Sequence, residues 1–244
     1  MIGWLRMPEA GRPHVITLYF PHTDDAGHRQ GPDSPAINRT VAQMDSVLGR
    51  LLDRIDELPH GDQVHVIVVS DHGMTRRDGR QVILDDWADL DGVVVVSATT
   101  LAHLHFHGDS ARRDAVKRSL DRAPHVRVFL RDEIPVEWGV KDNPRIGDIL
   151  IVADESAIVR RRDGRAEMNP ATHGWAPSTS MHGIFVAAGP GIRSGVRIPA
   201  FENIHVYPLM AGLLGLEPAP GIDGRIAVLA PILARSAARQ FLPR

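Results

Sequence analysis

A long amphipathic segment between two short apolar runs constrains the fold of this 244-residue chain more than any other feature. Apolar residues recur at helical spacing over residues 37–55, directly after Ser34-Pro35, which is a typical helix start. The flanking runs 15–20 (VITLYF) and 64–69 (VHVIVV) have the length of buried strands. This order predicts a parallel βαβ unit with polar residues beyond the carboxyl ends of its strands, where open α/β sheets bind ligands.

The composition limits the classes of function. The formal net charge is −2 with His neutral, so nothing attracts the whole chain to nucleic acid or to anionic membranes. No apolar run is long enough to span a bilayer, and residues 1–14 lack the apolar core of a secretory signal. There is no cysteine, so any transition-metal site must use the carboxylates and the 13 histidines. Location and oligomeric state are left open by the sequence.

The middle of the chain changes character, with short segments separated by charged turns. We expect strands at 93–96, 101–106, 126–130 and 149–152, and a helix at 112–120. This pattern predicts a small α+β lobe at 92–164, inserted into a core formed by residues 1–91 and 165–244. In the C-terminal part of that core we expect a strand at 183–188, a helix at 204–214 and a final helix at 226–241.

The first candidate metal cluster is Asp24 with His28, in the polar segment after the first apolar run. We expect this segment to be a loop, in which a carboxylate and an imidazole four residues apart close on one ion. Gly27 between them allows a tight turn. On its own the pair is weak evidence, and a loop aspartate with a surface histidine is then the favoured interpretation.

The second cluster, Asp71-His72, follows the second apolar run. Adjacent side chains on an extended segment diverge, so the two can share an ion only if the backbone turns sharply, which Gly73 permits. The alternative is a capping aspartate beside a solvated histidine.

His173, in Thr-His-Gly-Trp, is the third candidate ligand. His182, in Ser-Met-His-Gly before a strand, is also a candidate ligand, but a weaker one than His173. The sequence HLHFH places alternate histidines at 103, 105 and 107, and all three project from one face if this segment is a strand. We interpret that row as a polar exposed face of the lobe rather than a metal site.

Taken together, four segments resemble the nucleotide pyrophosphatase/phosphodiesterase family, part of the alkaline phosphatase superfamily. They are YFPHTDDAGHRQGPDSP, VIVVSDHGM, THGWAPSTSMHGIFVAAGPGI and ENIHVYPLMAGLLGLEPAPGIDG, in the family's order and spacing. The resemblance implies an α/β sandwich around a mostly parallel sheet with a small inserted lobe. It also implies two divalent ions, with zinc preferred.

By this resemblance, Asp24, His28 and His173 match the three ligands of one ion. Asp71 and His72 match two of the three ligands of the other. Two such ions about 3.5–4 Å apart clamp the attacking and leaving oxygens of an in-line displacement. Members of the family form a covalent phosphothreonine intermediate.

The chain departs from the family pattern before Asp24. The family's nucleophilic threonine and the third ligand of the second ion lie far upstream of this motif, and the 23 residues before Asp24 supply neither. Thr23, Ser70 and Thr75 stand beside ligands but not at the nucleophile position. We therefore expect no catalytic residue in this chain and N-terminal strands missing from the sheet. The chain is then a shortened enzyme, a fragment that works with a separate N-terminal piece, or an inactive domain.

The sequence thus predicts a metal-dependent hydrolase of phosphodiester or pyrophosphate bonds in nucleotide-like small molecules. Two alternatives remain. One is another superfamily hydrolase, such as a phosphonoacetate hydrolase or a phosphomonoesterase. The other is a non-catalytic zinc-binding fragment.

Overall fold

The computed structural model describes residues 1–164 and 169–241. Its α-helices are α1 (Ile2–Leu5), α2 (His22–Gln30), α3 (Pro35–Asp56), α4 (Ser110–Leu120), α5 (Val206–Leu213) and α6 (Arg235–Phe241). Its strands are β1 (Val66–Val69), β2 (Thr75–Arg76), β3 (Gln81–Ile83), β4 (Val94–Val96), β5 (Leu101–His105), β6 (Val126–Leu130), β7 (Ile149–Ala153), β8 (Ile158–Arg160), β9 (Ala171–Thr172) and β10 (Phe185–Ala188). Short 3-10 helices are η1 (Glu9–Gly11), η2 (Gly61–Gln63), η3 (Leu84–Asp86), η4 (Arg131–Glu133), η5 (Val136–Trp138), η6 (Thr179–Met181), η7 (Asn203–His205) and η8 (Ile226–Ile232).

The chain forms two compact units. One comprises Met1–Tyr19, Asp45–Val69 and Ile184–Arg244, and the other comprises Phe20–Met44 and Ser70–Gly183. The expected lobe at 92–164 within a core of 1–91 and 165–244 stays a prediction.

In the first unit, β1 and β10 form an antiparallel pair in which Val68 lies opposite Val186. One face of this pair packs on a core around Leu209 and Leu229, and the other packs on Ile55 and its neighbours. The parallel βαβ unit expected from the sequence is therefore wrong in its pairing, because the partner of β1 comes from the far end of the chain. Alternating apolar residues show that a strand forms but not which strand it joins.

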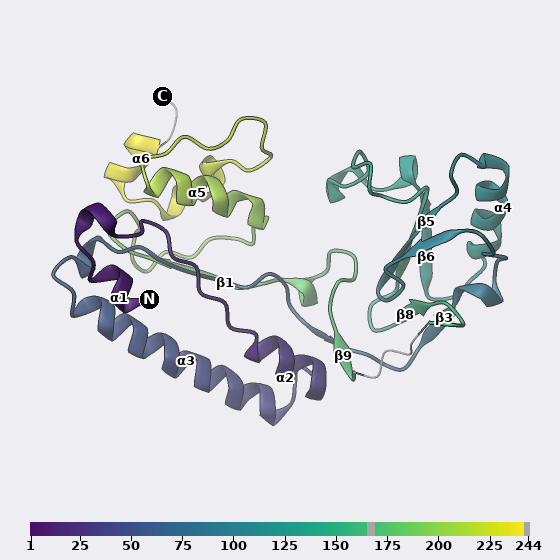
Figure 1. Cartoon of the computed structure of the whole chain (residues 1–244), viewed down its shortest axis with the longest axis horizontal. Coiled ribbons are helices and arrows are strands. Elements are labelled where there is room, and N and C mark those ends of the chain that lie inside the picture. The colour runs from purple at the N-terminus through teal and green to yellow at the C-terminus, as the bar shows by residue number, and fades with distance from the viewer. Residues whose placement is uncertain (165–168, 242–244) are drawn as a thin grey trace. The chain divides into compact units, whose positions relative to one another are not determined.

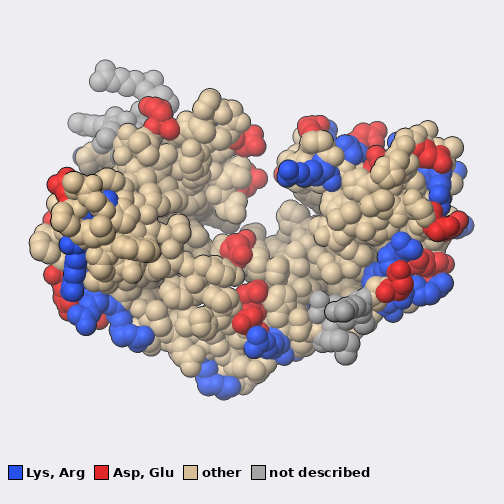
Figure 2. Space-filling view, in the orientation of Figure 1, with Lys and Arg blue, Asp and Glu red and all other residues tan. Residues whose placement is uncertain are grey.

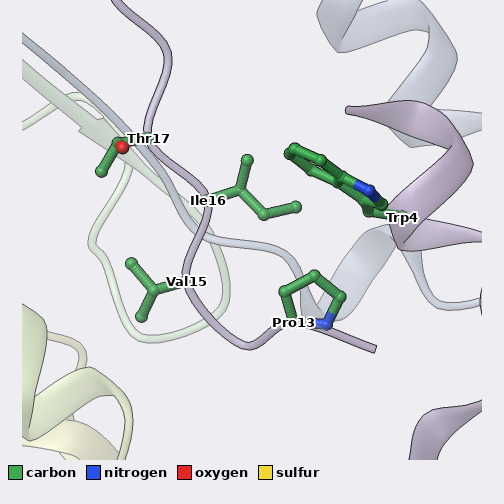
Figure 3. A pocket seen from close by; sticks show the side chains of 5 residues that line it. All are labelled: Trp4, Pro13, Val15, Ile16 and Thr17. Carbon is green, nitrogen blue, oxygen red and sulfur yellow. The ribbon is translucent and has the colours of Figure 1, made fainter. Parts of the chain in front are cut away.

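The apolar run 15–20, predicted as a strand, forms none. Its side chains alternate, with Ile16 directed toward Trp4 and Val15 and Thr17 directed away (Figure 3), but among the described residues no strand pairs with it. A strand needs a neighbour for its backbone hydrogen bonds, and the apolar pattern alone does not supply one. Tyr19 consequently remains 77% exposed.

An open pocket of about 340 Å³ lies along this segment, beside Trp4 of α1. It is lined by Trp4, Pro13, Val15, Ile16 and Thr17, none of which is titratable (Figure 3). It lies in the first unit, whereas all five predicted metal ligands lie in the second.

The second unit contains an antiparallel sheet in the order β4-β5-β7-β6, with α4 lying alongside it (Figure 1). Every residue of β7 is buried because both faces of this strand are covered. Ile149 and Ile151 face one core with Leu104 and Leu120, while Leu150 and Val152 face a smaller one. The continuous apolar run of β7 is typical of such a strand. The strands and the helix expected over 93–152 are confirmed.

The amphipathic helix is also confirmed as α3, and the Ser34 hydroxyl accepts a hydrogen bond from the Ile37 amide at 3.3 Å. The strand at 183–188 is confirmed as β10, and the helix at 204–214 is confirmed as η7 and α5. The single final helix at 226–241 is wrong. It is divided into η8 and α6, because Pro231 lies inside the segment and lacks the amide hydrogen that a continuous α-helix needs.

Protonation of His65 should make the fold less stable in mild acid. Its Nε2 accepts a hydrogen bond from the Gly191 amide at 3.0 Å, and partial burial lowers the pKa of His65. Its folded pKa thus lies below the unfolded value of about 6.5, so its contribution is complete above that pH and is lost as the pH falls through the folded pKa.

We expect His65→Gln, which keeps an acceptor but does not titrate, to flatten the dependence of the unfolding free energy on pH below about 6.5. Urea unfolding of parent and variant on both sides of this pH measures the difference. Equal slopes would show that His65 does not contribute.

Candidate metal centre

Asp24 and His28 lie on a helix and not in the expected loop. Helix α2 begins with acidic residues in its first turn and ends with His28 and Arg29 in its last, an arrangement that the helix dipole favours. Residues four apart on a helix share one face. Asp24 Oδ1 therefore lies 3.5 Å from His28 Nε2. The acidic start and basic end of this segment were the signal in the sequence for a helix.

His173 completes a group of three. It follows β9 directly, and its Nε2 lies 3.7 Å from Asp24 Oδ1. Asp24, His28 and His173 form the one group of potential metal ligands found among the described residues, with ligand atoms all within 4.8 Å of one another. Two bonds of about 2.0–2.1 Å in a tetrahedral site place their donor atoms about 3.4 Å apart. The separations measured from Asp24 Oδ1 are close to this value.

Two further features make this group suitable for binding a cation. Asp24 Oδ1 is buried and accepts no hydrogen bond within the described part of the chain, which is costly for a carboxylate oxygen. His28 Nδ1 donates to the carbonyl oxygen of Ala171 at 2.9 Å. That bond leaves the Nε2 lone pair of neutral His28 on the side of Asp24, as in histidines that bind metals.

The neutral form of His173 is favoured by its surroundings. Burial is the main cause that lowers the pKa of His173, followed by the neighbouring His72, while Asp24 raises it. The two imidazole rings of His72 and His173 stack, with centroids 3.5 Å apart and planes 14° apart. A neutral imidazole is the form that binds zinc, so these contacts favour binding.

The side chains of Asp71 and His72 lie close enough together to bind one ion. Asp71 Oδ2 lies 3.5 Å from His72 Nε2, and His72 Nδ1 donates to the carbonyl oxygen of Gly73 at 2.8 Å. The backbone bends at Asp71, and it packs closely at Gly73, where an ideal Cβ would lie only 2.0 Å from the carbonyl oxygen of Ser180. The side chain of Asp71 is 73% exposed, so this pair is more open than the group of three.

The competing histidines do not join either cluster. His103 and His105 lie on β5, but the strand ends at His105, and His107 has a φ of 51°. His182 is exposed and belongs to no ligand group among the described residues. Sequence reasoning missed the stacking of His72 on His173 and the Ala171 support of His28, for which a sequence offers no signal.

The charged surface matches the near-neutral composition. On the face drawn in Figure 2, Lys and Arg side chains are interspersed with Asp and Glu. Among the described residues, no helix has both the length and the apolar character needed to cross a membrane.

Comparisons with known proteins give one family. Residues 1–176 match the model of the type I phosphodiesterase / nucleotide pyrophosphatase family. Ectonucleotide pyrophosphatase/phosphodiesterase family member 7 from Homo sapiens is 32% identical over 229 residues, which are 90% of this chain and 49% of that protein. Bis(5'-adenosyl)-triphosphatase ENPP4 from Homo sapiens is 30% identical, over 84% of this chain and 45% of that protein. The chain spans about half the length of these relatives.

Solved structures agree with this result. Murine ectonucleotide pyrophosphatase / phosphodiesterase 5 superimposes with a TM-score of 0.86 at 29% identity, covering 96% of this chain and 62% of that protein. An inactive form of the same murine protein, in complex with AMP, gives a TM-score of 0.85. These matches confirm the α/β, alkaline phosphatase-like fold, although the sheets described here are small. The chain therefore belongs to the type I phosphodiesterase / nucleotide pyrophosphatase family.

Proposed function

We propose that this chain carries the metal-binding part of an active site that hydrolyses phosphodiester or pyrophosphate bonds in nucleotide-like small molecules. The observation that carries the proposal is the buried, unsatisfied Asp24 Oδ1 facing His28 and His173 at 3.5 and 3.7 Å. Family membership supports the reaction class, and the AMP complex of the murine relative supports a nucleotide-like substrate.

In this proposal Asp24, His28 and His173 hold one divalent ion, and Asp71 and His72 hold a second. Zinc fits best, because imidazole and carboxylate donors suit it and the chain has no cysteine. When bound, zinc supplies Lewis-acid stabilisation for the negative charge of a phosphoryl group. The pair Asp71 and His72 offers one ligand fewer than the group of three, so the second ion should bind more weakly.

The residues themselves contribute charge and orientation. Asp24 offsets part of the positive charge of an ion, and the Ala171 carbonyl fixes the ring of His28 through Nδ1. Among the hydroxyl groups considered as nucleophiles, that of Thr75 donates to Glu155 at 2.9 Å and is thus engaged elsewhere. No nucleophile is assigned to this chain.

The proposal is tested by zinc titration followed by hydrolysis assays. We expect one tight and one weak zinc site per chain by isothermal titration calorimetry, because the ligand sets differ. Two tight sites would contradict this assignment of ligands. With zinc added, any hydrolysis should be faster for bis(4-nitrophenyl) phosphate than for 4-nitrophenyl phosphate, and a chelator should abolish it.

Faster cleavage of the monoester would instead support another superfamily hydrolase. Zinc binding without hydrolysis of either ester would favour the non-catalytic zinc-binding fragment over the enzyme. An unchanged rate after Asp24→Asn would show that the observed hydrolysis does not use this site.

A further inference from the structure

We propose that Glu155 is a positioning residue that holds the segments bearing His72 and His173 in place for metal binding. This inference rests on the function proposed above, because it concerns the same site. Glu155 lies in the turn between β7 and β8, in the same compact unit as both histidines. Nothing in the sequence around Glu155 indicates such a role.

The turn that carries Glu155 is itself well anchored. Its Ser156 has a φ of 76°, a conformation that non-glycine residues adopt only where surrounding contacts impose it. The Ser156 carbonyl oxygen accepts a hydrogen bond from the Asp78 amide at 3.2 Å. The Glu155 carbonyl oxygen accepts one from the Arg80 guanidinium at 3.2 Å. These contacts hold the backbone of Glu155 in place and so limit where its side chain can lie.

The Glu155 carboxylate joins two segments that are distant in sequence. Its Oε1 accepts hydrogen bonds from the Thr75 hydroxyl at 2.9 Å and from the Ser180 hydroxyl. The Ser178 hydroxyl lies 2.9 Å from that of Ser180 and extends the network. Ser180, and then Thr75, hold the pKa of Glu155 below its usual value, so the carboxylate stays ionised and remains an acceptor.

Each of these segments leads directly to a histidine of the site. Thr75 pairs with Thr172 across β2 and β9, and Thr172 immediately precedes His173. On the other side, Met181 follows Ser180, and its carbonyl oxygen accepts a hydrogen bond from the Gly73 amide at 3.0 Å. The carbonyl oxygen of Gly73 in turn accepts from His72 Nδ1. The Glu155 carboxylate is thus linked, through short chains of hydrogen bonds and backbone, to both His72 and His173.

The same turn holds the His173 segment by a second route. The indole Nε1 of Trp175, two residues after His173, donates to the Ala157 carbonyl oxygen at 2.8 Å, and this bond is buried. The turn at 154–157 therefore contacts the chain just after His173 directly and supports Thr172, just before it, through Thr75. Its Glu155 side chain is the part that also fixes the position of His72.

The test compares Glu155→Ala with Glu155→Gln, which keeps a side-chain oxygen acceptor. Glu137→Ala is a matched control, because Glu137 is exposed in the same unit and its side chain makes no hydrogen bond or ion pair with the described residues. We expect Glu155→Ala to weaken zinc binding about tenfold, the lower end for loss of a group supporting a ligand. Glu155→Gln should restore most of the affinity, and Glu137→Ala should match the parent. Competition with a chromogenic chelator measures affinity, and the visible absorption of the cobalt-substituted protein reports ligand geometry.

Ser180→Ala removes one of the two hydroxyl donors to Glu155 and should give a smaller loss of zinc affinity. This variant replaces Glu155→Ala in the test if Glu155→Ala does not fold. Unchanged zinc affinity and cobalt spectrum in both alanine variants would overturn the inference. Glutamine as damaging as alanine would also overturn it, because an acceptor would then not suffice. Asp24→Asn in the same assay separates the two proposals. If it leaves zinc binding unchanged the proposed function fails, and if it alone weakens binding only the role of Glu155 fails.

Discussion

Replacing Asp24 by Asn should lower the zinc affinity of the tighter site by more than about 100-fold, the upper end of what loss of a supporting group costs. Asn keeps the size of the side chain but removes the negative charge that faces His28 and His173. The two imidazoles alone are a weak binding pair for a divalent ion. Calorimetry, or the increase in melting temperature on adding zinc, measures the loss.

Asp25→Asn is the matched control for this prediction. Asp25 is adjacent on α2, but its carboxylate is paired with the exposed Arg29 at 3.3 Å and is not part of the ligand group found among the described residues. An exposed pair of this kind contributes little, so the variant should bind zinc like the parent. Equal losses in the two variants would mean that Asp24 acts only through the charge of the helix.

Gly73→Ala is expected to destabilise the protein by about 3 kcal/mol, the upper end of the usual cost of an oversized group. The added Cβ would lie 2.0 Å from the Ser180 carbonyl oxygen and 3.0 Å from that of His182. Both obstacles are backbone atoms, which cannot rotate away as a side chain can. The segment bearing Asp71 and His72 would have to move, so zinc binding at the weaker site should be lost as well.

Gly49→Ala is a control that we expect to stabilise the protein, whereas Gly73→Ala should destabilise it. Gly49 lies within α3, and a Cβ there would meet nothing within 4 Å. Alanine should therefore stabilise the helix by about 0.5–1 kcal/mol. Thermal and urea unfolding of both variants, without zinc, test the pair. If Gly73→Ala unfolds like the parent, the close packing of the turn against Ser180 is not required.

Elements that depend on local pattern could be read from the sequence. Strand β6 and helix α4 lie where the alternation and the helical spacing of apolar residues predict them. The residues within each of these elements are enough to determine its type. The segment 15–20 has an equally apolar pattern and forms no strand, since a strand also needs a partner. The antiparallel pairing of β1 with β10 joins residues more than 100 positions apart, which alternation does not specify.

The candidate site divides in the same way. Only the resemblance to a family predicted that Asp24, His28 and His173 form one group. Taken singly, each of these residues is also consistent with an ordinary surface side chain. The helix that carries Asp24 and His28 was not predicted, although the acidic and basic residues at its ends are a sequence signal for it. The network of Glu155 could not be found in advance, because Thr75 and Ser180 are ordinary residues that only the fold brings to one carboxylate.

The placement of Asp24 and His28 one turn apart on α2 links metal binding to local order. Helix α2 has nine residues, too few to be stable in water on its own. An ion held by both side chains would close a ring across one helical turn and act as a staple on this helix. Zinc should then slow hydrogen exchange of the α2 amides more than that of the long, separately stabilised α3. The ion would thus serve as part of the folded structure as well as of the chemistry.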